Sequence, residues 1–354
     1  MNKRLIVTDT QNSALAIAAS NWARILDAEL IYSSNFRTRS KLVRFLVTSE
    51  PEWVLFSWRG GLSQILLSKK LTNMLSKNRP KTKYWFSVAD HASIETTMQT
   101  NEKILMNFCD GFTVVSKKLY DQYNYIFAPN TPTYIMHDLP NIDLLTKVSK
   151  LNIRREKTVI WIGNSKWGHR QGFIDHKGYE RYLKPIIARV NQIDNSIKFV
   201  IIDRAVKTYP QDEVLAMVAQ SKCTLQLSDS EGTGLPLIEA AYLGSIPLTR
   251  NVGIAPELLS RNSENFIFEK IDDFVSAIIE NTKGEFPIES LKLRTKEYIT
   301  EVEEEIKLIN FTKSAELLKF HLQSKWISQK ISSQISFAKW WIRYYISNRN
   351  RVEL

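Results

Sequence analysis

Short apolar runs alternate with stretches of helical periodicity along residues 1–140 of the chain. Runs with the length of buried strands occur at 5–8, 30–32, 53–56, 84–88, 112–115 and 134–136. Between them the apolar residues recur at helical spacing, which predicts helices over 13–26, 41–48, 62–76, 102–108 and 117–123. Regular alternation of strands and helices is typical of a parallel α/β sheet.

A polar and basic stretch at 147–157 interrupts this alternation and suits a linker between domains. Beyond it, strands are predicted at 159–163, 197–202 and 223–227, and helices at 179–190, 212–219, 236–243, 271–279 and 289–308. The chain has 354 residues, of which 44% are hydrophobic, enough for two cores. We therefore predict one α/β domain over residues 1–150 and a second over 151–310.

The stretch 228–257 joins a strand end, a glycine-flanked acid and a helix that begins abruptly. Gly232 and Gly234 allow a ligand to approach the backbone closely, and Pro236 suits the first position of a helix. First-turn amides have no intrahelical partner and lie at the positive end of the helix dipole. An anion placed before Leu235 would therefore be held without a basic side chain, and this loop is a candidate ligand site.

This stretch contains two acids. Glu231 lies within the loop, and Glu239 lies inside the helix that follows it. The helix around Glu239 is apolar on nearly every side, so its carboxylate is costly to bury unless a hydroxyl-rich ligand hydrogen-bonds it. Each acid alone has a simpler interpretation. Glu239 favours the start of a helix, and Glu231 suits a solvated loop. The two acids together with the glycines and Pro236 favour a binding site.

The letters EGTGLPLIEA at 231–240 resemble the E-G-x-G-L-P-x-x-E-A signature of retaining glycosyltransferases of family 4 and their GT-B relatives. The resemblance continues through Gly244, residues 246–247, Gly253 and residues 256–257. It implies two Rossmann-like domains with mostly parallel sheets, which face each other across a cleft. A nucleotide-sugar donor would bind the second domain and an acceptor the first.

The resemblance also implies roles for the residues of the loop. Glu231 would act at the reacting sugar by orienting its hydroxyls, and Glu239 would hold the ribose of the donor. The loop residues expected to contact the donor are Gly232, Thr233, Gly234 and Leu235. The positive helix end with Lys177 would stabilise the departing phosphate, so no metal or other cofactor is expected.

Two further donor contacts are implied where the second domain begins. The family has a glycine followed by an arginine after the first strand, and a Lys-Gly pair before the next helix. Here Gly163 matches the glycine, Asn164 stands in place of the arginine, and Lys177 matches the lysine after an insertion. Lys166 or Arg170 of the insertion would replace the missing charge. The alternative is that Lys177 is an exposed surface lysine.

In the first domain, the resemblance draws attention to loops that follow predicted strands. Asp90 and His91 follow the strand at 84–88, and many family members carry a histidine or an acid there that faces the donor sugar. Many members also have a Gly-Gly loop after their first strand, which this chain replaces by residues 9–13.

The loop after the predicted strand at 53–56 contains Arg59, Gly60 and Gly61. These residues would present a guanidinium and backbone amides to a ligand on the acceptor side. A plain glycine turn fits the same letters equally well.

The formal net charge of +11 predicts an anionic partner, such as a nucleotide, an acidic polysaccharide or anionic lipid. Nucleic acid is not expected, because zinc-ligand spacing, a helix-turn-helix and an aromatic RNA-binding signature are missing from the sequence. Cys109 and Cys223 lie far apart in apolar contexts and are expected to be reduced, which favours a cytoplasmic protein.

The last part of the chain differs from the rest. By the GT-B resemblance, residues 311–325 would form a helix that crosses back to the first domain. The tail, 326–354, contains a basic and aromatic amphipathic segment from Trp326 to Arg351 with one acid after it, Glu353. Such a helix suits an anionic membrane surface and would place the protein on the inner face of the membrane. A helix packed on the first domain or on a second subunit is an equal alternative.

The sequence thus predicts a metal-independent glycosyltransferase acting on a saccharide or lipid-linked acceptor in surface polysaccharide or glycolipid biosynthesis. Retention at the anomeric carbon is implied by the resemblance alone. The alternative is a catalytically inactive nucleotide-sugar or glycan-binding protein on the same fold, which Asn164 and the missing Gly-Gly loop favour. A nicotinamide-dependent oxidoreductase is disfavoured, because Leu237 stands where its fingerprint needs glycine.

Overall fold

The structure is a computed structural model that describes residues 3–11, 13–91, 99–127, 132–151, 153–169, 172–260, 263–284 and 288–312. The predicted segment from Trp326 to Arg351 and nearly all of 311–325 lie outside these ranges. Within them, no helix has both the length and the apolar composition needed to cross a bilayer.

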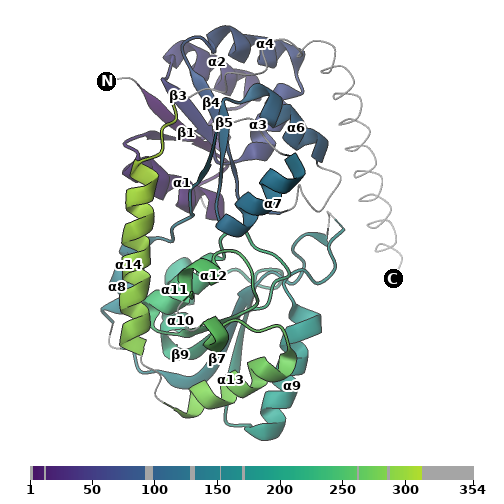
Figure 1. Cartoon of the computed structure of the whole chain (residues 1–354), viewed down its shortest axis with the longest axis vertical. Coiled ribbons are helices and arrows are strands. Elements are labelled where there is room, and N and C mark those ends of the chain that lie inside the picture. Colours follow the sequence, from purple (N-terminus) through teal and green to yellow (C-terminus); the bar gives the residue numbers. More distant parts are fainter. Residues whose placement is uncertain are drawn as a thin grey trace. The chain divides into compact units, whose positions relative to one another are not determined.

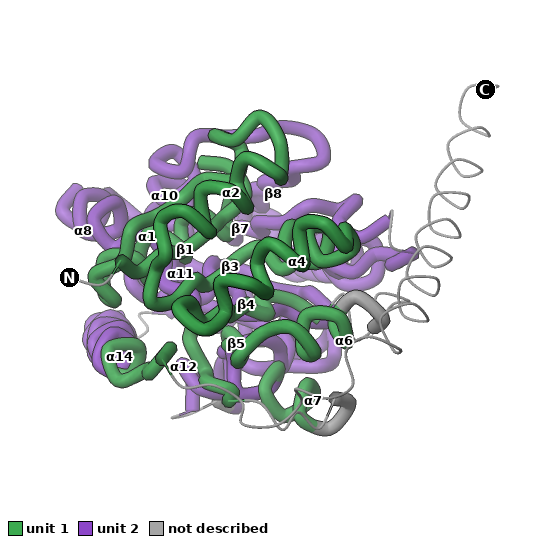
Figure 2. Tube along the Cα trace, turned by 90° about the horizontal axis from the view of Figure 1, so that it is seen from above, with its two compact units in different colours: residues 1–115, 119–137, 305–354 green, residues 116–118, 138–304 purple. Residues whose placement is uncertain are grey.

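The chain divides into two compact units, shown in Figure 2. Unit 1 comprises the described residues within 1–115, 119–137 and 305–354, and unit 2 those within 116–118 and 138–304. Each unit is built around its own parallel sheet. The predicted α/β class with parallel sheets is confirmed.

Unit 1 contains a six-stranded parallel sheet in the order β2-β1-β3-β4-β5-β6, with helices packed around it (Figure 1). The strands are β1 (Arg4–Thr8), β2 (Glu29–Tyr32), β3 (Trp53–Phe56), β4 (Lys83–Val88), β5 (Gly111–Val114) and β6 (Thr133–Ile135). The helices are α1 (Ala14–Ile25), α2 (Arg39–Ser49), α3 (Arg59–Leu66), α4 (Lys69–Asn78), α6 (Gln99–Phe108) and α7 (Lys117–Phe127), whose first two residues belong to unit 2, with a 3-10 turn η1 (Ser33–Asn35). Every strand predicted in this part of the sequence is present, with ends shifted by about one residue.

The single helix predicted over 62–76 is wrong, because two helices, α3 and α4, occupy this stretch. Ser68 has an extended backbone between them, with φ −94° and ψ 109°. The hydroxyl of Thr72 donates to the carbonyl oxygen of Leu66 at 2.9 Å, across the break. Hydroxyl side chains offer the backbone such alternatives to helical hydrogen bonds.

The core of unit 1 is rich in aromatic side chains and includes the residue Phe311. Its ring lies 4.7 Å from the ring of Trp53 and 5.1 Å from that of Trp85, and its carbonyl oxygen accepts a 2.8 Å hydrogen bond from Trp85 Nε1. A buried tryptophan N–H needs such a partner. The chain therefore returns from unit 2 to complete the core of unit 1.

Unit 2 contains a four-stranded parallel sheet in the order β10-β9-β7-β8. Its strands are β7 (Glu156–Gly163), β8 (Lys198–Asp203), β9 (Ser221–Gln226) and β10 (Ile246–Thr249). Its helical segments are α8 (Ile142–Ser149), the π-helical turn η3 (Tyr179–Leu183), α9 (Lys184–Ile193), α10 (Gln211–Gln220), α11 (Leu235–Leu243), α12 (Ala255–Leu258), η4 (Ser263–Asn265), α13 (Ile271–Lys283) and α14 (Ile288–Lys307), whose last turn belongs to unit 1.

The division between the units differs from the predicted boundary at residue 150. It falls between His137 and Asp138, so α8 belongs to unit 2. Leu145 and Val148 of α8 are buried, and the hydroxyls of Thr146 and Tyr242 lie 3.1 Å apart. The linker predicted at 147–157 is therefore wrong at both ends, because α8 extends to Ser149 and packs on α10 and α11, and β7 begins at Glu156.

Candidate functional site

The glycine loop predicted to bind the donor lies at the carboxyl end of β9, where ligands bind in parallel sheets. Gly234 ends the loop with φ +85° and caps α11, a conformation that L side chains rarely adopt. Residues 237–243 of α11 are all buried. The loop is therefore fixed between a central strand and a helix enclosed by protein.

Glu231 lies in this loop within a network of hydrogen bonds. Its Oε1 atom accepts from Gln226 Nε2 at 2.7 Å and from Ser228 Oγ at 2.6 Å, and it pairs with Lys177 Nζ. Burial alone would raise the pKa of Glu231, but the Lys177 ammonium and the Ser228 hydrogen bond outweigh it and hold this pKa below its ordinary value. Glu231 is therefore an ionised carboxylate held in one position.

Lys177 reaches Glu231 because the insertion predicted after β7 folds against the glycine loop. His176 Nε2 lies 3.0 Å from the carbonyl oxygen of Ser230, and the amide of Asp229 donates to the carbonyl of His176 at 2.9 Å. The ring of Trp167 lies 4.4 Å from that of His176 and 5.2 Å from Lys177 Nζ. Lys177 is therefore a half-buried member of the site, with its side chain 16% exposed. Arg170 lies outside the described residues.

Glu239 is buried in α11, as the apolar surroundings in the sequence predicted, with 8% of its surface exposed. Gln211 Nε2 donates to its Oε1 atom at 3.3 Å. Burial raises the pKa of Glu239 to about 6. The carboxylate is therefore poorly solvated by the protein and suited to accept hydrogen bonds from ligand hydroxyls.

Asp138 is a second buried acid at the loop, and sequence reasoning missed it. Thr233 Oγ1 donates to Asp138 Oδ2 at 2.9 Å, and burial raises the pKa of Asp138 to about 7. The carbonyl of Thr233 accepts from the amide of Ile254 at 3.0 Å. The only signal in the sequence was an acid placed among apolar residues just before Pro140.

The remaining donor-side candidates lie in the turn after β7. Asn164 Oδ1 accepts from the amide of Lys166 at 3.0 Å, while the side chain of Lys166 is exposed. A Cβ atom on Gly163 would overlap the ring of Trp161. The turn is fixed by Asp203 Oδ2, which accepts from Ser165 Oγ at 2.6 Å.

In unit 1, Asp90 and His91 follow β4, and Asp90 is joined to Arg59. Arg59 Nη2 lies 2.6 Å from Asp90 Oδ1, and Arg59 Nε lies 2.9 Å from Glu102 Oε1. Burial opposes the charge of Arg59, but the two carboxylates outweigh it and hold the pKa of the guanidinium above its ordinary value. Arg59 was expected to offer its charge to a ligand, but the structure places it in an internal ion-pair network. His91 is buried, with 3% of its surface exposed.

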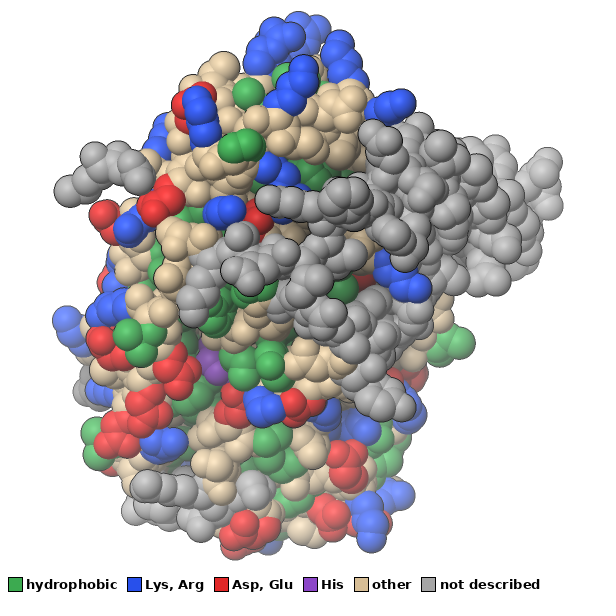
Figure 3. Space-filling view, turned by 45° about the horizontal axis from the view of Figure 1, so that its top comes forward, with side chains coloured by type: hydrophobic (Ala, Val, Ile, Leu, Met, Phe, Trp, Pro, Cys, Tyr) green, Lys and Arg blue, Asp and Glu red, His purple; other side chains and the backbone are tan. Residues whose placement is uncertain are grey.

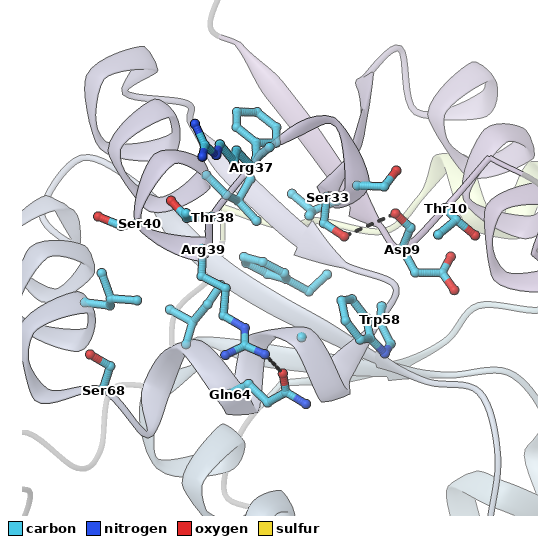
Figure 4. A pocket seen from close by; sticks show the side chains of 18 residues that line it. Asp9, Thr10, Ser33, Arg37, Thr38, Arg39, Ser40, Trp58, Gln64 and Ser68 are labelled. Atoms are coloured by element: carbon cyan, nitrogen blue, oxygen red, sulfur yellow. Dashed lines mark hydrogen bonds between the residues drawn. The ribbon is translucent and has the colours of Figure 1, made fainter.

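Gly60 and Gly61 lie at the start of α3 against the ring of Trp58. A Cβ atom on Gly61 would approach Trp58 Cε3 to 2.5 Å, so glycine is needed for the indole to pack there. Trp58 and Gly61 line a cavity of about 940 Å³ at the carboxyl ends of β1, β2 and β3 (Figure 4). This cavity was not predicted, because its wall comes from segments as distant in sequence as Val7 and Leu71.

Residues 188–302 match the model of a protein family described as glycosyl transferases, group 1. This segment lies within unit 2, covers less than half of the chain and includes Glu231 and Glu239. No curated protein matches the chain in sequence.

Solved structures resemble the chain in fold. An α,α-trehalose-phosphate synthase of Burkholderia xenovorans, solved with glucose-6-phosphate, has a TM-score of 0.53 and 10% identity, covering 86% of this chain and 98% of that one. The catalytic domain of starch synthase IV from Arabidopsis thaliana, bound to ADP and acarbose, has a TM-score of 0.51 and 10% identity. The match covers 96% of this chain and 99% of that domain. TarM of S. aureus has a TM-score of 0.51 and 15% identity over 81% of this chain, which spans only 57% of TarM. These likenesses show the GT-B fold.

Proposed function

We propose that the chain is a glycosyltransferase that takes a sugar from a nucleotide-sugar donor bound to unit 2. The observation that carries the proposal is the ionised Glu231 beside Lys177, in a glycine loop that opens α11. The family match over residues 188–302 and the GT-B fold support it.

The donor side would act through charges already in place. Breaking the bond between the anomeric carbon and the phosphate makes the sugar positive and the departing nucleotide negative. Lys177 would turn from Glu231 to the leaving phosphate, while Gln226 and Ser228 keep Glu231 in position at the sugar. Glu239 would accept hydrogen bonds from the ribose hydroxyls. This arrangement requires no metal, so chelation with EDTA is expected to leave transfer unchanged.

The finer parts of the proposal rest on the motif and on composition. Transfer would retain the configuration at the anomeric carbon, and the acceptor would be a saccharide or a lipid-linked saccharide of surface polysaccharide or glycolipid biosynthesis. The protein would work in the cytoplasm, on the inner face of the membrane, with the segment from Trp326 to Arg351 on anionic lipid. NMR of the product measures its anomeric configuration and so tests retention. Flotation of the full chain with anionic vesicles tests binding to the membrane surface.

The decisive experiment is a transfer and hydrolysis assay over a panel of UDP-, ADP- and GDP-sugars. Glu231→Gln is expected to lower the rate of transfer by about 100-fold or more, while nucleotide binding by calorimetry is retained. Glu180→Gln, which removes an exposed carboxylate three residues after Lys177 that pairs with Lys184, serves as the matched control. Unchanged transfer in Glu231→Gln would disprove the role of the motif.

The second candidate is a binding protein on the same fold that has lost turnover. Asn164 in place of an arginine and the loop at 9–13 in place of Gly-Gly favour it. This candidate predicts that nucleotide sugars bind but are neither transferred nor hydrolysed under any condition of the panel.

A further inference from the structure

The cavity of unit 1 has a wall of positive charge. Residues 37–40, at the start of α2, form one side of it, and this side includes Arg37 and Arg39. In Figure 4 the Arg39 guanidinium lies beside Gln64, whereas the Arg37 guanidinium points outward. Within the described residues neither guanidinium forms a salt bridge with a carboxylate, and Arg39 is hydrogen-bonded to the neutral amide of Gln64. In the same unit, Arg59 is neutralised by two carboxylates. The cavity lining therefore includes two arginines that form no ion pair with a described carboxylate, and one carboxylate, Asp9, on its other side.

The opposite side of the cavity suits a sugar. It is lined by Trp58, Asp9 and Ser33, which lie away from the two arginines in Figure 4. The Ser33 hydroxyl donates to the carbonyl of Asp9 at 3.1 Å, which fixes the two loops together. An aromatic face with a carboxylate and hydroxyls nearby provides both stacking and hydrogen-bond partners for a sugar ring.

The surface around the cavity is also basic. Lys and Arg side chains gather at the end of unit 1 that carries α2 and α4 (Figure 3). The exposed basic residues of these two helices are Arg39, Lys41, Arg44, Lys69, Lys70 and Lys77. A surface of one sign raises the local concentration of ligands of the other sign.

We infer that this cavity binds the acceptor as a saccharide that carries a phosphate or carboxylate group. The anionic group lies at the Arg39 guanidinium, beside Gln64, and the sugar ring lies against Trp58. Guanidinium groups suit this role because they form charge-assisted, often paired, hydrogen bonds with both anions. The assignment of the ligand as acceptor rests on the proposed function, whereas the binding of an acidic sugar does not.

The first test measures binding of three probes to the full chain by saturation-transfer NMR: glucose 6-phosphate, glucuronate and glucose. At least one acidic sugar is expected to bind about tenfold or more tightly than glucose. Its advantage is expected to shrink as salt rises from low to physiological concentration. Comparison of the phosphate and carboxylate probes identifies which anionic group the cavity prefers. Equal binding of all three probes, or no binding, would refute the inference.

The second test uses charge-removing variants on the same helix. Arg39→Gln is expected to weaken binding of the preferred acidic sugar about tenfold and to leave glucose unaffected. Arg44→Gln removes the same charge from an exposed position that does not line the cavity, so binding is expected to be unchanged. If both variants lost the same affinity for the acidic sugar, the binding would come from general surface charge, and the proposed site would be refuted. If Arg39→Gln does not fold, the probe comparison on the unmodified chain still decides.

Nucleotide binding separates this inference from the proposed function. Arg39→Gln is expected to bind UDP and ADP as the unmodified chain does, because Arg39 belongs to unit 1 and the donor loop to unit 2. Acidic-sugar binding without glycosyl transfer would refute the activity and keep the site. Transfer to neutral acceptors alone would refute the site and keep the activity.

Discussion

Glu231 of the donor loop and Glu239 of α11 differ in how well the surrounding protein stabilises their ionised forms. Glu231 accepts hydrogen bonds from Gln226 and Ser228 and pairs with Lys177, so it is ionised before any ligand arrives. Glu239 has one 3.3 Å hydrogen bond, from Gln211, and a pKa of about 6. The folded protein therefore bears a cost for Glu239 that a bound hydroxyl-rich ligand would relieve.

Glu239→Gln is expected to stabilise the protein at alkaline pH. The folded-state pKa of about 6 lies above the ordinary value of 4.5, so the carboxyl favours folding below pH 4.5. That stability is lost as pH rises through 6. At pH 8 the ionised group costs about 2 kcal/mol, which the neutral amide avoids. Urea unfolding at pH 8 and pH 5 measures the difference.

The same variant is expected to bind nucleotide at least about tenfold more weakly, because the amide replaces an ionised acceptor. Glu213→Gln, at an exposed position on α10, is the control for both measurements. A gain in stability that is equal at pH 5 and pH 8 would contradict the assignment of the cost to ionisation.

At the level of elements, the insertion after β7 fixes the position of the lysine of the site. The ring of His176 packs against that of Trp167, and its Nε2 atom lies 3.0 Å from the carbonyl oxygen of Ser230, so the insertion contacts the loop of Glu231 directly. The site thus includes a supporting contact that holds Lys177 and the loop of Glu231 together.

His176→Ala is expected to lower kcat about tenfold and to change the Kd for nucleotide by less than about threefold, since His176 positions Lys177 and does not contact the donor. Steady-state kinetics with nucleotide calorimetry separates the two effects. His176→Gln, which keeps an N–H donor near the carbonyl of Ser230, is expected to restore most of the rate. A parallel loss of kcat and affinity in both variants would indicate a general loss of structure.

The sequence predicted the elements that depend on local pattern. The strands of unit 1 and helix α11 were identified because apolar runs, Pro236 and Gly244 mark them directly. Contacts between distant segments were not predictable. His176 meets Ser230 across 54 residues, Asp138 meets Thr233 across 95, and no periodicity encodes either pairing. The break at Ser68 was missed because the apolar spacing continues through it.

At the scale of the whole molecule, one unit depends on residues from the far end of the described chain. Unit 1 starts at the beginning of the sequence, yet Phe311 fills its core beside Trp53 and Trp85. Helix α14 carries the chain from unit 2 back into unit 1. The two units are therefore separate cores joined by more than one chain crossing.

Phe311→Ala is expected to destabilise unit 1 by about 3–5 kcal/mol, because it leaves a cavity against two tryptophans. Hydrogen exchange followed by mass spectrometry is expected to show faster exchange in β3 and β4, with β7 and β9 unaffected. Leu308→Ala, at a side chain that is 83% exposed, is the control. Equal acceleration of exchange in both sheets would show that the cores do not unfold separately.

This return of the chain affects the order in which the protein can fold during synthesis. A ribosome makes unit 1 first, but the Phe311 side chain that covers Trp53 and Trp85 is added only after all of unit 2. Until then, the nascent unit 1 exposes apolar surface of the kind that chaperones bind and that aggregates. Unit 2 is contiguous apart from residues 116–118 and can complete its core first. The last-made domain is thus positioned to fold before the first-made one.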